Sequence, residues 1–276
     1  MGTIKVGEEN STAIELYYED IGSGSPVVLI HGWPLSGASW EKQIAALLKA
    51  GYRVITYDRR GFGRSSKPST GYDYDTFAAD LHQVLTTLHL QKVALVGFSM
   101  GTGEVTRYLA RYGSERVSKA VLIGTLGPYL VKAGDNPQGV DAGVFESIRA
   151  GLKADRPTAL LDFLHNFYNY DVLGGKLVSE RVVEDNWNVA AGASALAIVR
   201  CVYAWLEDFR QDLRHNDIPT LILHGDADRI LPPDASSRRQ ATMLANCKFV
   251  EIKDAPHGLI WTHASRINEE LLSFLR

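Results

Sequence analysis

Cysteine is scarce in this chain, and long apolar runs are missing. Only Cys201 and Cys247 occur among 276 residues, too few for a disulfide framework and at no usual zinc spacing. We interpret both as buried thiols. No apolar run approaches the roughly 20 residues that span a bilayer, and residues 1–20 carry charges throughout. We therefore expect a cytoplasmic protein without a membrane span.

Charge of one sign is also lacking. The chain has 29 basic and 32 acidic side chains, a formal net charge of -3, and no basic cluster. Without such a patch there is no electrostatic footprint for nucleic acid or anionic lipid. We expect small-molecule partners instead. The loops could also support a homo-oligomer, a state that the sequence leaves open.

Signatures of metal and nucleotide sites are missing as well. Neither H-E-x-x-H nor the phosphate-binding G-x-x-x-x-G-K-[ST] occurs. The string Gly61-Phe62-Gly63-Arg64-Ser65-Ser66 resembles a dinucleotide fingerprint but lacks its third glycine and opens no periodic helix, so we interpret it as a structural turn. We expect neither a metal nor a cofactor.

Short β-branched runs alternate with stretches of helical period, a pattern typical of a mostly parallel sheet with crossover helices. Helical spacing predicts helices around residues 77–88, behind the cap candidates Asp75 and Thr76, around 105–112, ending at Gly113, and around 267–275. The apolar runs predict strands at 27–30, 54–57, 93–96, 120–123, 221–223 and 249–252.

Between about residues 126 and 211 the strand pattern disappears, and the segment is helical and aromatic. We interpret it as a helical cap inserted into an α/β core made of residues 1–125 and 212–276. Its aromatic side chains favour an apolar cover over a substrate site. Most of them are also explained by helix packing alone.

The string Gly97-Phe98-Ser99-Met100-Gly101 matches G-x-S-x-G. The motif alone is weak, but here the serine follows a predicted buried strand and opens a predicted helix, which is the strand-turn-helix of a nucleophile elbow. The flanking glycines suit a sharp turn in which side chains would collide with neighbouring strands. We therefore predict that Ser99 is a nucleophile.

A serine nucleophile needs a histidine base, and that histidine needs a carboxylate. The order on such a sheet is serine, acid, histidine. Only His257 and His263 follow a plausible acid turn, and His257 lies in a loop just after a predicted strand, so we assign the base to it. Asp226 and Asp228 compete for the acid. We assign Asp228, because Asp226 is well placed to bond turn backbone.

Acyl transfer develops an oxyanion, which preorganised backbone N–H groups stabilise. We expect one donor at Met100, directly after the nucleophile, and a second at Trp33 in the loop after the first parallel strand. His31 in the same loop is interpreted as an organising residue. Pro34 drives Trp33 into extended geometry, and their peptide bond could be cis. We hypothesise that the Trp33 carbonyl then accepts a hydrogen bond from hydrogen peroxide.

With these motifs the chain resembles the α/β-hydrolase superfamily, and within it the cofactor-free bacterial haloperoxidase (perhydrolase), arylesterase and γ-lactamase group. The resemblance implies a Ser99-His257-Asp228 triad, an oxyanion hole at Trp33 and Met100, and a small cap over an apolar acyl site. It runs nearly end to end, through the strings LIHGWP (29–34), YDRRGFG (57–63), YDYDTFAADL (72–81), VGFSMG (96–101), LHGDAD (223–228) and APHG (255–258).

The resemblance implies a serine esterase acting on small carboxylic and aryl esters, with perhydrolase or non-heme chloroperoxidase activity when hydrogen peroxide discharges the acyl-enzyme. A γ-lactamase is the enzymatic alternative, and a ligand receptor on a hydrolase scaffold is the non-enzymatic one. A dehalogenase would need an aspartate at position 99. Candidate substrate-binding side chains are those of Trp33, Pro34, Phe98, Phe145, Phe163 and Trp205.

Overall fold

An eight-stranded sheet lies at the centre of the computed structural model, which describes residues 1–276. The strand order is β1-β2-β4-β3-β5-β6-β7-β8. Neighbours from β4 to β8 pair in parallel, whereas β2 pairs antiparallel with both β1 and β4. The strands are β1 Gly2–Glu9, β2 Thr12–Ile21, β3 Pro26–Ile30, β4 Arg53–Tyr57, β5 Val93–Phe98, β6 Val117–Ile123, β7 Thr220–Gly225 and β8 Cys247–Ile252.

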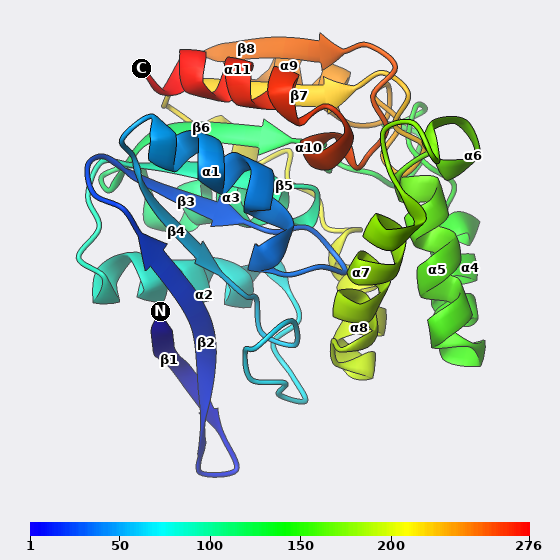
Figure 1. Ribbon diagram of the computed structural model, residues 1–276, viewed down its shortest axis with the longest axis horizontal. Coiled ribbons are helices and arrows are strands. Elements are labelled where there is room, and N and C mark those ends of the chain that lie inside the picture. Colours follow the sequence, from blue (N-terminus) through cyan, green and yellow to red (C-terminus); the bar gives the residue numbers. More distant parts are fainter.

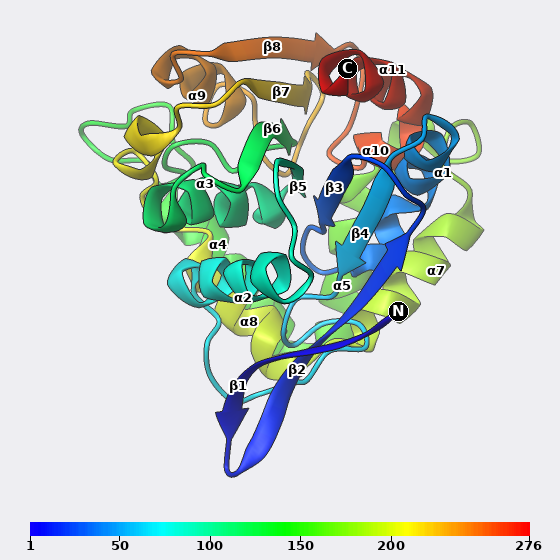
Figure 2. The same ribbon diagram turned by 90° about the vertical axis from the view of Figure 1, so that its left-hand side faces the viewer.

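Helices cover both faces of the sheet. Figure 2 shows α2, α3 and α9 on one face and α1, α10 and α11 on the other. The helices are α1 Glu41–Lys49, α2 Tyr74–Thr87, α3 Met100–Tyr112, α4 Ala142–Ala154, α5 Arg156–Phe167, α6 Tyr170–Leu173, α7 Glu180–Ala191, α8 Ala195–Ala204, α9 Ser237–Met243, α10 Leu259–Thr262 and α11 Ala264–Leu275, with short 3₁₀ turns at Gly37–Trp40 and Asp212–His215.

All six strands predicted from apolar runs are present, each somewhat longer than its run. Their side chains alternate between two cores. Val27 and Leu29 of β3 join the cluster that includes α1 and α11, whereas Val28 and Ile30 join the cluster that includes α2 and α3. Because successive side chains of a strand point to opposite faces, a strand buried on both faces has no polar alternate. The observed sheet explains the continuous apolar runs.

The N-terminal hairpin β1–β2 has no counterpart among the predicted strands. In these two strands only Ile4, Ile14 and Leu16 are buried hydrophobic residues. The hairpin projects from the edge of the sheet (Figure 1), and most of its residues are half-buried or exposed. Antiparallel strands with one solvated face lack the continuous apolar run by which buried parallel strands are found.

Two local predictions were wrong. Asp75 and Thr76 lie inside α2, which begins at Tyr74, and the capping residue is Asp73, whose Oδ1 accepts a hydrogen bond from the Thr76 amide at 2.8 Å. Cys247 is half-buried at the start of the outermost strand β8, where one side has no partner strand, whereas Cys201 is buried as expected.

Five helices, α4 to α8, fill the chain between β6 and β7. In Figure 1 they lie beyond the carboxyl ends of the parallel strands, where ligands of open α/β sheets bind. The boundaries 126 and 211 of a separate cap stay a prediction. No single helix is long and apolar enough to span a bilayer. The pair α7 and α8 reaches that length and composition only together, across a 95° bend.

Candidate active site

Ser99 stands at a sharp turn between β5 and α3. Its backbone angles are φ 52° and ψ -120°, a region that non-glycine residues rarely occupy. Strain of this kind persists only where the surrounding structure enforces it, and it gathers at functional sites. The turn lifts the hydroxyl out of the strand, and Ser99 keeps 7% of its surface accessible.

The two glycines of the motif allow the strand and helix to approach closely. A Cβ atom at Gly97 would lie 2.5 Å from the carbonyl oxygen of Gly101, and one at Gly101 would lie 2.4 Å from that of Ile30. Both distances are shorter than any real carbon–oxygen contact of this kind. The elbow therefore requires glycine at both positions, as predicted.

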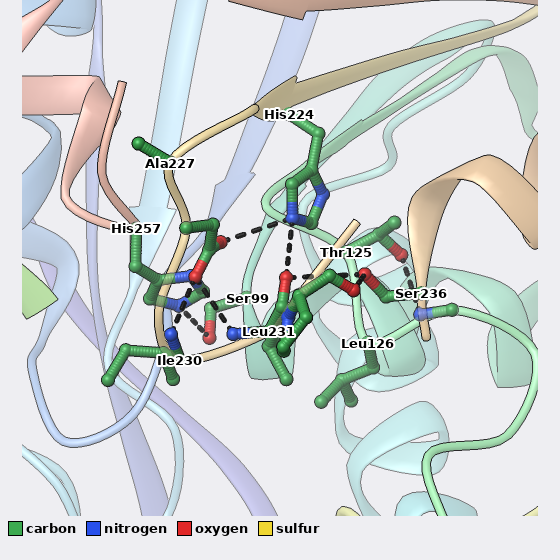
Figure 3. A network of polar contacts seen from close by, with 12 residues as sticks. Ser99, Thr125, Leu126, His224, Ala227, Ile230, Leu231, Ser236 and His257 are labelled. Carbon is green, nitrogen blue, oxygen red and sulfur yellow. Dashed lines mark hydrogen bonds and ion pairs between the residues drawn. The ribbon is translucent and has the colours of Figure 1, made fainter. Parts of the chain in front are cut away.

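His257 connects Ser99 to Asp228. The Ser99 Oγ lies 2.8 Å from His257 Nε2, and His257 Nδ1 lies 2.6 Å from Asp228 Oδ2. The three residues come from the turns after the parallel strands β5, β8 and β7, and Figure 3 shows Ser99 and His257 close together. An Nδ1–H facing the carboxylate leaves Nε2 unprotonated toward the hydroxyl, and in this tautomer the imidazole can accept the serine proton.

The Asp228 carboxylate is buried and surrounded by N–H groups. Its Oδ1 accepts hydrogen bonds from the amides of Ile230 and Leu231, both at 2.8 Å. On the other side, His224 Nε2 lies 3.1 Å from Oδ2. Burial alone would raise the pKa of Asp228, but the facing His257 and the contacts of both histidines hold that pKa below its ordinary value. The group therefore stays ionised at neutral pH.

The other candidates for the acid and the base, Asp226 and His263, make different hydrogen bonds. Asp226 Oδ1 accepts a hydrogen bond from the Asp254 amide at 2.6 Å and so ties two turns together. His263 lies at the start of α11, where its Nδ1 is 3.0 Å from the hydroxyl of Thr262. Neither residue hydrogen-bonds to Ser99 or His257.

Two free amides flank the serine. Neither the Trp33 nor the Met100 backbone N–H donates a hydrogen bond within the protein, although both residues are buried. The Trp33 loop lies directly against the nucleophile, since a Cβ atom at Gly32 would be 2.9 Å from the Cβ of Ser99. Buried donors without an acceptor are rare, and a developing oxyanion would supply one.

A buried network of Arg59, Glu104 and His31 supports the loop that carries Trp33. Arg59 Nη2 donates to the His31 carbonyl oxygen at 2.9 Å, and its Nε donates to Glu104 at 2.8 Å. The Arg59 amide donates to His31 Nε2 at 2.9 Å, while His31 Nδ1 faces the Gly32 carbonyl at 2.8 Å. Burial, and then the Arg59 charge, lower the pKa of His31 well below its ordinary value. His31 is thus a neutral organising residue, not a second base.

An apolar cavity of about 490 Å³ reaches the surroundings of the triad at Trp33, Ile230 and Leu231. This volume falls within the usual range for small-molecule sites, about 300 to 1,000 Å³. Trp33 and Leu231, which lie near the triad, form part of its wall. Asp162, Asn166 and Arg229 contribute polar groups to the lining. The apolar lining comprises Trp33, Val140, Val144, Phe145, Ile148, Leu152, Ala159, Phe163, Trp205, Ile230 and Leu231.

Four predicted substrate-binding side chains, those of Trp33, Phe145, Phe163 and Trp205, line this cavity, and two do not. Phe98 is fully buried and packs behind His257, with ring centroids 5.3 Å apart. Its position on β5 turns it into the core. Pro34 is buried within the loop, and the Trp33–Pro34 bond is cis, as considered from the sequence.

Sequence reasoning missed several residues of the site. His224 received no role, although it stands four residues before the chosen acid on the same strand and turn. Ile230 and Leu231 hold the carboxylate through their backbone amides, which carry no sequence signal. The aliphatic residues of α4 that line the cavity do not differ in pattern from ordinary helix packing.

Comparison with known proteins identifies the family of this chain. The model of the alpha/beta hydrolase fold family matches residues 25–264. A Synechocystis sp. protein whose name marks it as an unproven non-heme chloroperoxidase is 57% identical over 276 residues, all of both chains. The bifunctional esterase/perhydrolase of Acinetobacter calcoaceticus is 37% identical over 95% of this chain and 96% of its own. The crystal structure of a Bacillus anthracis bromoperoxidase superposes with a TM-score of 0.96 at 50% identity, covering 99% of each chain.

The chain therefore belongs to the α/β-hydrolase family. Within that family, its relatives place it in the group of non-heme haloperoxidases and esterase/perhydrolases, as the sequence motifs indicate. It is an enzyme of the serine hydrolase and perhydrolase class.

Proposed function

We propose that the protein transfers the acyl group of small carboxylic and aryl esters through an acyl-enzyme on Ser99. The observation that carries this proposal is the continuous path from Ser99 Oγ through His257 to Asp228, with steps of 2.8 and 2.6 Å. Acyl transfer also needs donors for an oxyanion and a site for the acyl group. The two free amides would supply the donors, and the apolar cavity would supply the acyl site.

In the first half-reaction His257 Nε2 takes the Ser99 proton as Oγ attacks the carbonyl carbon. The carbonyl oxygen becomes an oxyanion facing the amides of Trp33 and Met100. When the carbon–oxygen bond to the alcohol breaks, His257 returns the proton to the departing oxygen. Asp228 stabilises the imidazolium present between these two transfers.

In the second half-reaction water or hydrogen peroxide attacks the acyl-enzyme. His257 takes a proton from the attacking molecule and returns it to Ser99 Oγ as the ester bond to the enzyme breaks. Water yields the carboxylic acid, and hydrogen peroxide yields the peracid. A released peracid transfers one oxygen to bromide or chloride and becomes the acid, so hypohalite forms outside the enzyme. Halide oxidation by this route uses no cofactor.

The peroxide branch has a specific candidate group. The Trp33 carbonyl oxygen accepts no hydrogen bond from the protein. We propose that this carbonyl accepts a hydrogen bond from hydrogen peroxide. Replacing Pro34 by Leu should lower the ratio of peracid to acid product, and an unchanged ratio would overturn this role.

Kinetics on the purified protein test the main proposal. Hydrolysis of an aryl acetate should disappear in Ser99→Ala, and a fluorophosphonate should label the native protein at Ser99. The matched control is Ser273→Ala, an exposed serine of α11, which should behave like the native enzyme. Bromide oxidation should require both hydrogen peroxide and an ester. A protein that no fluorophosphonate labels would favour a receptor, and a higher specificity constant for a bicyclic γ-lactam would favour a lactamase.

A further inference from the structure

A second histidine contacts the carboxylate of the proposed triad. His224 lies on β7, four residues before Asp228, and its side chain is completely buried. Its Nε2 and the Nδ1 of His257 approach the same carboxylate oxygen, Asp228 Oδ2, and Figure 3 labels both histidine rings. His224 does not itself line the cavity, and no hydrogen bond joins it to Ser99, so the proposed mechanism leaves it unused. A buried polar ring at this position needs an explanation.

The surroundings of His224 assign its protons. Its Nε2 lies 2.9 Å from the Leu231 carbonyl oxygen and 3.1 Å from Asp228 Oδ2. Both partners are acceptors, so Nε2 carries the hydrogen. Its Nδ1 is buried without a partner, and a proton there would have no acceptor. The ring is therefore an Nε2–H donor.

This donor closes a small turn around the carboxylate. The Leu231 amide donates to Asp228 Oδ1, and the Leu231 carbonyl receives the His224 N–H. One residue thus binds the carboxylate on one side and the histidine on the other. The only further contact to that carbonyl is the more distant Ser236 hydroxyl, at 3.4 Å. His224 therefore supplies the main support of this end of the turn.

We propose that His224 is a positioning residue for acyl transfer: its Nε2–H fixes the turn from Asp228 to Leu231 and places a second N–H beside Oδ2. The carboxylate then cannot rotate away from His257. This inference rests on the proposed function, because positioning of Asp228 affects rate only if His257 is the base.

Other charges near the carboxylate point elsewhere. Asp226, Arg229 and Asp254 line a surface cavity together with Asp228. Asp226 bonds the Asp254 amide, and Arg229 pairs with Asp171 at 2.7 Å. Among titratable side chains, only the two histidines lie within hydrogen-bond distance of Asp228, so a change in its pH response traces to one of them.

Loss of the His224 N–H has a distinct signature. With one N–H fewer beside it, the carboxylate stabilises the imidazolium form of His257 more strongly. The acidic limb of kcat/KM should then move to higher pH, by about half a unit or more. The carboxylate also gains freedom to turn, so kcat/KM at the optimum should fall about tenfold to a hundredfold, chiefly through kcat.

Two amide substitutions separate positioning from packing. The amide nitrogen of Gln reaches the place of Nε2, whereas that of Asn reaches only the place of Nδ1. We expect His224→Gln to stay within about threefold of the native kcat/KM and to keep its pH profile. His224→Asn should show the loss and the shift of the acidic limb. His224→Leu, which has no donor, should match Asn.

The readouts are aryl acetate kinetics and the second-order rate of fluorophosphonate labelling, each measured across pH. Thermal unfolding checks that each variant is folded. If His224→Leu does not fold, the comparison of His224→Gln with His224→Asn still tests the role of His224. Equal losses in Gln and Asn, or a kcat/KM loss with an unmoved acidic limb, would overturn the role of His224. Ser99→Ala separates the two proposals, because an active Ser99→Ala enzyme would overturn the proposed function and this inference with it.

Discussion

Replacing Asp228 by Asn tests the proton path with almost no change of shape. Four N–H groups surround this carboxylate, from Ile230, Leu231, His224 and His257, at 2.6 to 3.1 Å. An amide offers one oxygen and one NH₂ group. Whichever way it turns, its NH₂ group faces two of these four hydrogens.

His257 is the partner that can change its tautomer. Backbone amides cannot give up their protons, so the Asn oxygen should stay on Ile230 and Leu231 while the NH₂ group faces His257. His257 must then place its proton on Nε2, toward Ser99, where it can no longer accept the serine proton. A wrong tautomer of this kind lowers kcat by about 10⁴-fold, or about 5.4 kcal/mol in activation free energy.

The assay is aryl acetate hydrolysis at saturating substrate, with fluorophosphonate labelling as a second measure. Asp226→Asn is the matched control, because its amide oxygen can still accept from the Asp254 backbone, and it should retain activity within about twofold. A kcat for Asp228→Asn within tenfold of the native value would refute the reasoning. It would show that the carboxylate does not select the tautomer of His257.

Three further outcomes follow from the same structure. Since folding lowers the pKa of Asp228, its contribution to the free energy of unfolding is complete above its unfolded pKa of about 3.9 and is lost as pH falls through the lower folded pKa. The stability deficit of Asp228→Asn should therefore be constant near neutral pH and shrink in acid denaturation series below about pH 4. Gly32→Ala, which places a Cβ atom 2.9 Å from the nucleophile, should lower kcat about tenfold to a hundredfold, whereas Gly134→Ala, in open space, should not. Arg59→Met should lower the free energy of unfolding in urea by about 3 to 5 kcal/mol, because it leaves Glu104 buried without its partner, and Glu104→Leu in the same chain should restore part of it.

Much of the core and of the triad could be predicted because both leave a pattern in a few consecutive residues of the sequence. A strand buried on both faces must be apolar throughout, as at Val27–Ile30, and a nucleophile elbow must have glycine at Gly97 and Gly101. The acid and the base follow strands in a fixed order, so Asp228 and His257 could be chosen among few candidates.

The features that escaped prediction depend on contacts between distant segments. The β1–β2 hairpin lies at an edge and buries few side chains, so its pattern is weak. His224 acquires its role only when the chain turns back at Leu231, and the cavity wall forms only when α4 and α5 pack over Trp33. Phe98 adjoins the nucleophile in sequence, yet its strand position points it into the core.

Trp33 connects the helices between β6 and β7 with the loop beside the nucleophile. Its indole Nε1 donates to the Ile198 carbonyl of α8 at 3.2 Å, and its ring packs edge-on against Phe163 and Trp205, at centroid distances of 4.7 and 5.0 Å. The backbone just before the same residue, at Gly32, lies against the nucleophile. Exchanging the helices between β6 and β7 with those of a relative would therefore alter turnover as well as substrate preference, and engineering of this segment should carry the tryptophan's aromatic neighbours along.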